Sequence, residues 1–152
     1  MNIVPKIALY EPDIPQNTAA IMRTCACLGV KLEIIEPCGF LFSDQRFKRV
    51  VMDYMDNDKI KFYESSSHFF ESKGNQRIIL MTTKVTKPYT TFEFKDNDTI
   101  LFGRESSGVP EKVHKLINNK LTIPMKKNKR SLNIASSVAI VVAESLRQLK
   151  II

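Results

Sequence analysis

The stretch LFGRESSGVP, residues 101–110, decides the fold of this chain when it is read with two later segments. The later segments are IPM, residues 123–125, and RSLNIASSVAI, residues 130–140. Short apolar runs of the kind found in buried strands precede these turns, and the last segment begins a helix. Turns and helix starts present free backbone amides, and these segments add a carboxylate, hydroxyls and a basic run. The pattern predicts a binding site for a polar cofactor.

Length and charge limit the possibilities. The chain has 152 residues, 43% of them hydrophobic, which predicts a single globular domain over residues 1–152. Its formal charge is +7, from 23 Lys and Arg against 16 Asp and Glu, and its pI is about 9.4. Such an excess favours an anionic partner, most simply nucleic acid. A basic but merely soluble protein remains an equal alternative on charge alone.

Short β-rich runs alternate with helical stretches along the chain. This alternation predicts an α/β fold, with a mostly parallel sheet covered by helices on both faces. Asp13 and Ser43 are candidate helix caps, and Gly29 and Gly74 are candidate helix ends. The polar connection over residues 82–98 is expected to be mobile. The expected strands are residues 6–10, 31–35, 59–63, 77–81, 99–102 and 121–123, and helices are expected from about Pro15, Ser43, Ser66 and Pro110 and at the C-terminus.

The three cysteines are odd in number and lack the spacing of a zinc site. Reduced thiols in a cytoplasmic protein without a metal are the simplest interpretation, and Cys25 is expected in the core. The N-terminal residues have no apolar segment of the kind that forms a signal peptide or a membrane span. His68 and His114 are both expected at the surface, where neither is an attractive base.

Three ordered motifs carry a resemblance to a known family. The segment PQNTAAIMRTCACLG, residues 15–29, precedes the two turns and the helix start described above. Together they resemble motifs one, two and three of the SPOUT, or α/β-knot, RNA methyltransferases of the SpoU type. IEPCGF, residues 35–40, and MDY, residues 52–54, narrow the resemblance to the tRNA wobble-nucleotide 2′-O-methyltransferases. The resemblance spans nearly the whole chain.

The resemblance implies a fold, a cofactor and partners. A deep trefoil knot is expected from about Arg77 to the C-terminus, and its loops would hold S-adenosylmethionine. The implied partners are tRNA, at its anticodon loop, and a second copy of the chain, which packs on the last helix and shares the site. The expected cofactor contacts are Met81, Gly103, Gly108, Ile123, Met125, Ser131 and Leu132.

Several of these positions also have ordinary structural explanations. Gly103 lacks a Cβ, so a ligand could approach its backbone or it could adopt positive φ, but it could also be a plain turn glycine. Ser131 and Asn133 could cap the last helix or face a ligand. Glu105 could favour a sulfonium cation electrostatically or be a solvated acid. The resemblance places Glu105, Ser131 and Asn133 among the catalytic positions.

Arg23 is the arginine of motif one, and Asn17 lies six residues before it. Methyl transfer to a ribose hydroxyl requires alignment of the oxygen and a route for its proton. Because a guanidinium stays protonated in proteins, Arg23 is expected to grip phosphate and stabilise the developing alkoxide. Asn17 would orient Arg23 or the substrate, or alternatively cap the first helix.

Two basic clusters are candidates for RNA binding. Phosphate contacts position a protein on RNA, and lysines and arginines commonly supply them. A charge run can equally be a solvated loop. The candidates are Arg46, Lys48 and Arg49 in one cluster and Lys126, Lys127, Lys129 and Arg130 in the other.

The chain also departs from the family pattern. Ala19 and Ala20 replace the usual Gly-Asn, Ala135 and Ser136 replace Ser-Asn, and Ala143 stands where a tyrosine is common. The leading prediction is an S-adenosylmethionine-dependent methyltransferase acting on the 2′-hydroxyl of the wobble nucleotide, a cytidine or modified uridine. Alternatives are a catalytically weakened RNA-binding or assembly protein, methylation at another tRNA or rRNA site, and an unrelated α/β enzyme acting on a phosphorylated small molecule.

Overall fold

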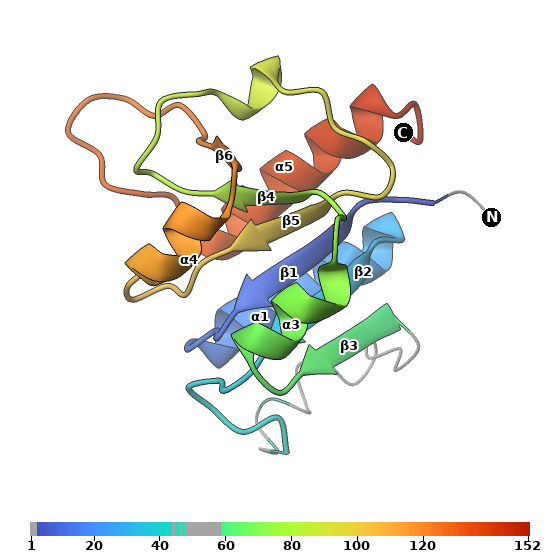
Figure 1. Ribbon diagram of the computed structural model, residues 1–152, viewed down its shortest axis with the longest axis vertical. Helices are drawn as coiled ribbons and strands as arrows, with labels where there is room; N and C mark the ends of the chain where they lie inside the picture. The colour runs from blue at the N-terminus through green and yellow to red at the C-terminus, as the bar shows by residue number, and fades with distance from the viewer. Residues whose placement is uncertain (1–2, 44, 46, 48–58) are drawn as a thin grey trace.

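Six parallel strands form one sheet in the computed structural model (Figure 1). The structure describes residues 3–43, 45, 47 and 59–152. The strand order is β3-β2-β1-β5-β4-β6, and all five pairings are parallel. The strands are β1 (Lys6–Tyr10), β2 (Lys31–Ile35), β3 (Ile60–Tyr63), β4 (Ile78–Met81), β5 (Thr99–Phe102) and β6 (Asn119–Leu121). The expected α/β class and parallel sheet are confirmed.

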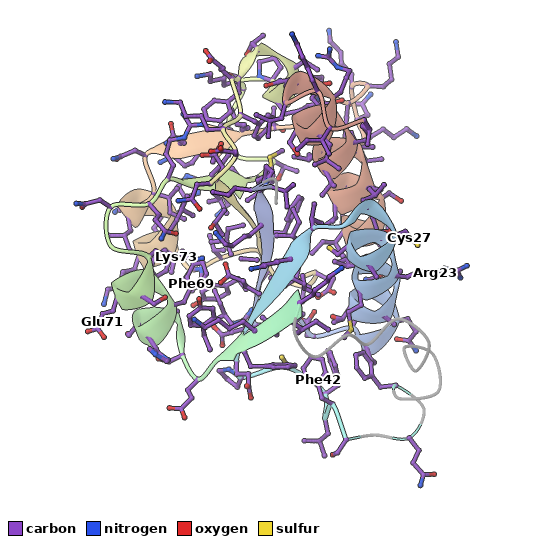
Figure 2. The ribbon with its side chains drawn as sticks, turned by 90° about the vertical axis from the view of Figure 1, so that its right-hand side faces the viewer. Arg23, Cys27, Phe42, Phe69, Glu71 and Lys73 are labelled. Carbon is purple, nitrogen blue, oxygen red and sulfur yellow. The ribbon has the colours of Figure 1, made fainter. Side chains whose placement is uncertain are left out.

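Helices cover both faces of the sheet. Helices α1 (Pro15–Leu28) and α5 (Ile134–Gln148) lie together on one face, and α3 (Ser66–Lys73) and α4 (Glu111–Leu116) lie on the other (Figures 1 and 2). A short 3₁₀ helix, η2 (Tyr89–Thr91), lies in the connection between β4 and β5.

Strand β1 shows why the sheet is buried on both sides. Successive side chains of a strand point to opposite faces. Ile7 and Leu9 therefore join the core beneath α1 and α5, whereas Ala8 and Tyr10 join the core beneath α3 and α4. All four are at most 4% exposed. Burial on both faces explains the nearly continuous apolar runs that the strands have in the sequence.

Two helices end at the predicted glycines, but one predicted N-terminal cap is wrong. Gly29 ends α1 in the left-handed region with φ 72°, and Gly74 follows α3 with φ 53°. Helix α1 begins after Ile14, with Pro15 in its first turn and no side-chain cap. Asp13 does not cap this helix, because its carboxylate is bonded to a neighbouring loop instead.

The connection over residues 82–98 is anchored, contrary to the expectation of a mobile loop. Phe92 and Phe94 are 8% and 3% exposed and join the core. The side chain of Gln148 at the end of α5 donates to the carbonyl oxygen of Phe92 and accepts from the amide of Phe94, both at 2.9 Å. Asp98 receives two hydrogen bonds from Arg77, at 2.8 and 2.7 Å.

Other expectations differ in their boundaries or fall outside the described residues. The last strand is Asn119–Leu121 and not residues 121–123, because Leu121 pairs with Met81 and the chain then turns into the cleft described below. The helix expected from about Ser43 falls mostly on residues 44, 46 and 48–58, outside the described residues. The same holds for MDY, residues 52–54. The trefoil knot remains a prediction from the resemblance. In the part of the chain that is described, no helix is both long and apolar enough to cross a membrane.

Candidate active site

A cleft of about 550 Å³ lies at the carboxyl ends of β4, β5 and β6. This is where open parallel sheets commonly bind ligands, because loops and helix starts meet there. The size is within the usual range for small-molecule sites. The lining comprises residues 80–84, 102–109, 122, 123, 125 and 130–134, together with Ile14, Asn17, His114 and Ser137.

The structure brings all seven expected cofactor-binding residues to this cleft, from the end of β4, the loop after β5 and the loop between β6 and α5. Apolar side chains, among them Met81, Ile123 and Leu132, lie beside polar ones such as Ser131 and Glu105. The cleft can therefore accept a ligand that combines an aromatic face with charged and hydrogen-bonding groups. The full set is Met81, Gly103, Gly108, Ile123, Met125, Ser131 and Leu132.

Gly103 and Gly108 shape the loop after β5. The backbones of Arg104 and Gly108 exchange two hydrogen bonds, at 3.2 and 2.8 Å, which close this loop. A Cβ on Gly103 would lie 2.6 Å from the Cα and carbonyl carbon of Gly108. Gly108 itself has φ 67°, a left-handed conformation that suits glycine. Of the alternatives for Gly103, positive φ is wrong, because that conformation belongs to Gly108. The missing Cβ of Gly103 makes room for the chain's own turn, as in a turn glycine, and its contact with a cofactor stays a prediction.

Asn133 links the start of α5 to α1. Its Oδ1 accepts from the amides of Ala135 and Ser136, at 2.8 and 3.4 Å, so Asn133 is the helix cap. Its Nδ2 donates to Oδ1 of Asn17 at 3.0 Å. Asn17 therefore does not cap α1, but fixes the start of α1 beside the start of α5. Ser131 is exposed and lines the cleft.

Glu105 lies against Asp13, which follows β1. The backbone amide of Asp13 donates to Oε2 of Glu105 at 3.0 Å, and the hydroxyl of Ser106 donates to Oδ2 of Asp13. Arg104 forms an ion pair with Glu11 at 2.9 Å. Three consecutive residues of the loop after β5 are thus tied to the loop after β1. Glu105 is held by these contacts, so it is not a freely solvated acid.

The two carboxyl groups have opposite pKa shifts. Burial, and then the hydrogen bond to Asp13, raises the pKa of Glu105 above its usual value. The hydrogen bond from Glu105 is the largest cause that lowers the pKa of Asp13. The pair therefore holds a shared proton on Glu105 in preference to Asp13 as the pH falls. The other Asp13 oxygen, Oδ1, is buried and has no further partner among the described residues.

Gly39, in the loop after β2, is the third component of this contact. A Cβ on Gly39 would lie 2.7 Å from Cβ of Asp13, and the amide of Gly39 donates to the carbonyl of Pro12 at 2.9 Å. Cys38 beside it is half-buried, and burial, with the nearby glutamates, raises the pKa of its thiol to about 12. Cys25, Cys27 and Cys38 are all free, and Cys25 is buried as expected. Although IEPCGF contributes to the family resemblance, the sequence did not identify Asp13, Gly39 or Ser106 as parts of the site.

His114 was expected at the surface, and this expectation is wrong. It is half-buried and lines the cleft, because α4 follows the loop that contains Gly108 and Val109. His68 is exposed, as expected. Among the described residues, no group of three or more His, Cys, Asp or Glu side chains could hold a metal ion.

Arg23 is the one expected catalytic residue that does not line the cleft of its own chain. It lies on the exposed side of α1, and Figure 2 shows it pointing away from the sheet on the same side as Cys27. Arg23 has an interaction with another group of the chain. Asn17, Glu105, Ser131 and Asn133 all line the cleft.

The expected RNA-binding residues fall into two groups. Lys126, Lys127 and Lys129 are exposed in the loop between β6 and α5, and Arg130 extends this loop into the lining of the cleft. The loop turns at Asn128, which has φ 69°. Arg46, Lys48 and Arg49 lie outside the described residues.

Sequence relatives share nearly the whole length of this chain. It is 46% identical over 144 residues to the tRNA (cytidine(34)-2'-O)-methyltransferase of Beijerinckia indica subsp. indica, covering 93% of this chain and 90% of the relative. It is 38% identical over 145 residues to the tRNA (cytidine(34)-2'-O)-methyltransferase of Escherichia coli, covering 94% and 92%.

Solved structures agree with these relatives. One described as structural insights into the 2-OH methylation of C/U34 on tRNA has a TM-score of 0.91 and 35% identity, and 97% of each chain is covered. The SpoU methyltransferase AviRb of Streptomyces viridochromogenes, in complex with AdoMet, shares the fold with a TM-score of 0.84 at 19% identity, over 99% of this chain and 62% of AviRb. The sequence profile of the SpoU rRNA Methylase family matches residues 5–143. The chain therefore belongs to the SpoU methylase family.

Proposed function

We propose that this chain is an S-adenosylmethionine-dependent tRNA methyltransferase, and that it methylates the 2′-hydroxyl of the wobble ribose in the anticodon loop. The observation that carries the proposal is the convergence of all seven expected cofactor residues on one cleft, in a chain that is 46% identical to a cytidine(34) 2′-O-methyltransferase. The loop of an RNA hairpin exposes its riboses, so a compact protein can reach such a nucleotide.

The residues of the cleft fit the proposed cofactor. Bound S-adenosylmethionine would supply an electrophilic methyl group on a sulfonium centre. Met81, Ile123 and Leu132 offer apolar surface for an adenine, while the loop containing Gly108 presents backbone groups. Glu105, when ionised, favours positive charge in the cleft electrostatically. Asp13 and Ser106 hold Glu105 in place through the loop contacts described above.

We further propose a homodimer in which the partner supplies Arg23. Arg23 does not line its own cleft, so it can act in catalysis only if a second cleft is brought to it. Around it, α1 and α5 lie side by side and expose small or apolar side chains, including Ala20, Cys27, Ile140 and Ala143. Small side chains permit the close approach of a second helix pair. At the partner's cleft, the guanidinium of Arg23 would grip RNA phosphate and stabilise the developing alkoxide.

Mixed dimers test this arrangement. Each proposed site combines Glu105 of one chain with Arg23 of the other. A dimer of Arg23→Ala lacks the arginine in both sites, and a dimer of Glu105→Ala lacks the glutamate in both, so neither variant alone should methylate tRNA well. Unfolding and random reassembly of the two variants together gives mixed dimers with one intact site. Half of the dimers are then mixed, and one of the two sites in each is intact, so about a quarter of all sites should be active. If no activity returns although mixed dimers form, Arg23 does not act across the interface.

The alternatives can be ordered on the same observations. Family membership excludes the unrelated small-molecule enzyme. A catalytically weakened RNA-binding protein would still bind tRNA but would incorporate no methyl group. Ala19 is buried on α1, and Ala20 on α1 and Ala143 on α5 are exposed. None of the three lines the cleft. These departures therefore leave the lining of the cleft unchanged, which supports the active enzyme over the weakened one.

Methyl transfer from a labelled donor tests the proposal directly. Pure protein is incubated with separate tRNA and rRNA pools, and the modified ribose is mapped. Label is expected in tRNA at the wobble position. A tRNA with a single deoxyribose at that position should bind almost normally and accept no methyl group. Equal methylation of the deoxy-substituted tRNA would show that the wobble assignment is wrong, and binding without any incorporation would favour the RNA-binding alternative.

A further inference from the structure

A second cavity, of about 310 Å³, lies at the opposite edge of the sheet from the cleft. Lys6 and Lys31 are the first residues of β1 and β2, and Lys59 directly precedes β3, so the cavity lies at the amino ends of the strands. The cleft lies at their carboxyl ends. Since strands of four or five residues separate the two, they are on the order of 15 Å apart. This lysine cavity, lined by Lys6, Lys31, Lys59, Lys61 and Lys73, therefore does not belong to the cofactor site.

Register explains why these lysines gather. Lys6 is paired with Lys31, and Glu33 is paired with Lys61, across three neighbouring strands. Alternation along each strand places Lys31, Glu33, Lys61 and Tyr63 on the face that α3 covers. Like charges on adjacent strands, about 4.8 Å apart, repel each other. The fold thus concentrates positive charge at this edge at a cost in stability.

The negative charge in the cavity lining is already neutralised. Glu33 is 4% exposed, and its Oε1 forms an ion pair with the buried Lys73. Its Oε2 accepts a hydrogen bond from the hydroxyl of Tyr63 at 2.7 Å. Figure 2 shows Lys73 on the side of α3 that faces the sheet, while Glu71 points to the outer side. Glu33 is the one carboxylate among the described residues that line this cavity.

The remaining four lysines have no anionic partner among the described residues. Lys6 donates to the neutral Oδ1 of Asn97 at 3.1 Å, and Lys61 lies 4.9 Å from the centre of the Tyr63 ring. Burial is the largest cause that lowers the pKa of Lys73, and the nearby charges of Lys6 and Lys61 lower it further, so these charges reach into the cavity. The hydroxyls of Tyr63 and Ser72 already donate to Glu33 and to the carbonyl of Phe69, so the lysines and the amide of Gln76 are the donors that a ligand would meet. Such a cavity, with its one carboxylate neutralised, matches an anion.

We propose that this lysine cavity binds phosphate groups, and that the ligand is the backbone of the same RNA at a distance from the methylated ribose. The step to RNA rests on the proposed function, whereas the step to phosphate rests on the cavity alone. Lysine is a compact point charge with three donors, which suits a phosphate oxygen without reading a base. The contact would position the tRNA and would carry no sequence information.

The test compares two double variants that each remove two positive charges. Lys31→Ala with Lys61→Ala changes the cavity, and Lys95→Ala with Lys112→Ala changes exposed lysines outside both cavities. tRNA affinity is measured over a range of salt concentrations, and inorganic pyrophosphate binding is measured by calorimetry. S-adenosylmethionine affinity is measured on every variant to show that the fold is intact.

The cavity variant is expected to bind tRNA several-fold more weakly than the control. Its slope of log affinity against log salt should fall by roughly 0.9 for each duplex phosphate that the variant no longer neutralises. If pyrophosphate binding disappears only in the cavity variant while the tRNA salt slopes stay unchanged, the cavity is a phosphate site. The RNA backbone is then not its ligand. Equal slopes and equal pyrophosphate binding in both variants would overturn the whole proposal. If the wild-type protein does not bind tRNA, the proposed function fails, and the pyrophosphate measurement still decides whether the site exists.

Discussion

The two edges of the sheet, at the carboxyl and amino ends of the strands, form their cavities from different parts of the chain. At the carboxyl edge, tight turns and a helix start form the cleft, and Glu105 is held by contacts from the loop after β1. At the amino edge, side chains from three strands and α3 form the cavity, around the buried pair of Glu33 and Lys73. Backbone shape therefore governs the first site, and charge governs the second. Variants at the two edges should affect different measurable quantities.

The largest expected effect is on stability, at the amino edge. Lys73→Met leaves Glu33 buried with the Tyr63 hydroxyl as its remaining described partner. Removal of one member of a buried ion pair typically costs about 3–5 kcal/mol, so the free energy of unfolding should fall by about that amount. Denaturant unfolding measures it, with the exposed Lys95→Met as the control.

The double variant Glu33→Gln with Lys73→Met should recover part of this loss, because no unpaired charge remains buried. S-adenosylmethionine affinity of the folded protein should stay near the wild-type value in all of these variants. A large change in that affinity would show that the two edges of the sheet are coupled and do not act independently.

The next effect is on catalysis, in the cleft to which a partner is proposed to supply Arg23. Arg23→Lys keeps the charge but loses the planar donor pair of arginine. The single-turnover rate of methyl transfer should fall by about a hundredfold or more, the usual range for loss of a donor to a developing oxyanion. Cofactor binding and the unfolding midpoint should be retained. Turnover like that of the wild type would leave Arg23 as a helix-surface residue.

Two glycines of one loop provide a smaller and more specific contrast. Gly108→Ala meets no atom within 4 Å but must keep φ 67°, which costs about 1–2 kcal/mol. Gly103→Ala would place its Cβ 2.6 Å from the Gly108 backbone, so the turn must move. Calorimetry with S-adenosylmethionine is expected to show the greater loss of affinity for Gly103→Ala. Equal losses would mean that the close approach at Gly103 does not shape the cleft.

The smallest expected effect is a shift in pH dependence. The pKa of Glu105 is raised above its unfolded value, so ionising Glu105 costs folding free energy. That cost is absent below the unfolded pKa and complete above the folded one. If the carboxylate supports cofactor binding, affinity should fall as the pH drops through the raised pKa.

Asp13→Asn removes the neighbouring negative charge and keeps an oxygen that can accept from Ser106. The pKa of Glu105 should then decrease, and the loss of affinity should begin at a lower pH than in the wild type. Cofactor affinity measured from neutral to mildly acidic pH tests this. An unchanged profile would show that the carboxyl pair does not control binding.

The sequence allowed the cleft to be predicted because its constraints are local. A glycine with φ 67° at position 108 and a helix cap at Asn133 leave recognisable residues in short segments. The contact between Asp13 and Glu105 joins residues 92 positions apart and depends on the pairing of β1 with β5. The lysine cavity depends in the same way on strand register. The sequence marked Asp13 only as a candidate helix cap, and Lys31 stands in no pattern that distinguishes it from an ordinary surface residue.

The connection over residues 82–98 shows a different reason for a wrong prediction. Its polar composition indicated a loose segment, yet Phe92 and Phe94 anchor it in the core. Their alternation with Glu93 was a visible signal of one buried face. The amide side chain of Gln148 could not be anticipated, because it bonds to this backbone from the far end of α5.

Gly39 has a consequence for protein engineering. Its backbone lies against Asp13, which in turn holds Ser106 and Glu105, so loops from three strands interlock at one point. Grafting any one of these loops from another enzyme would introduce a collision or an orphaned carboxylate. Attempts to exchange substrate preference should therefore transplant residues 11–14, 36–40 and 103–108 as a single unit.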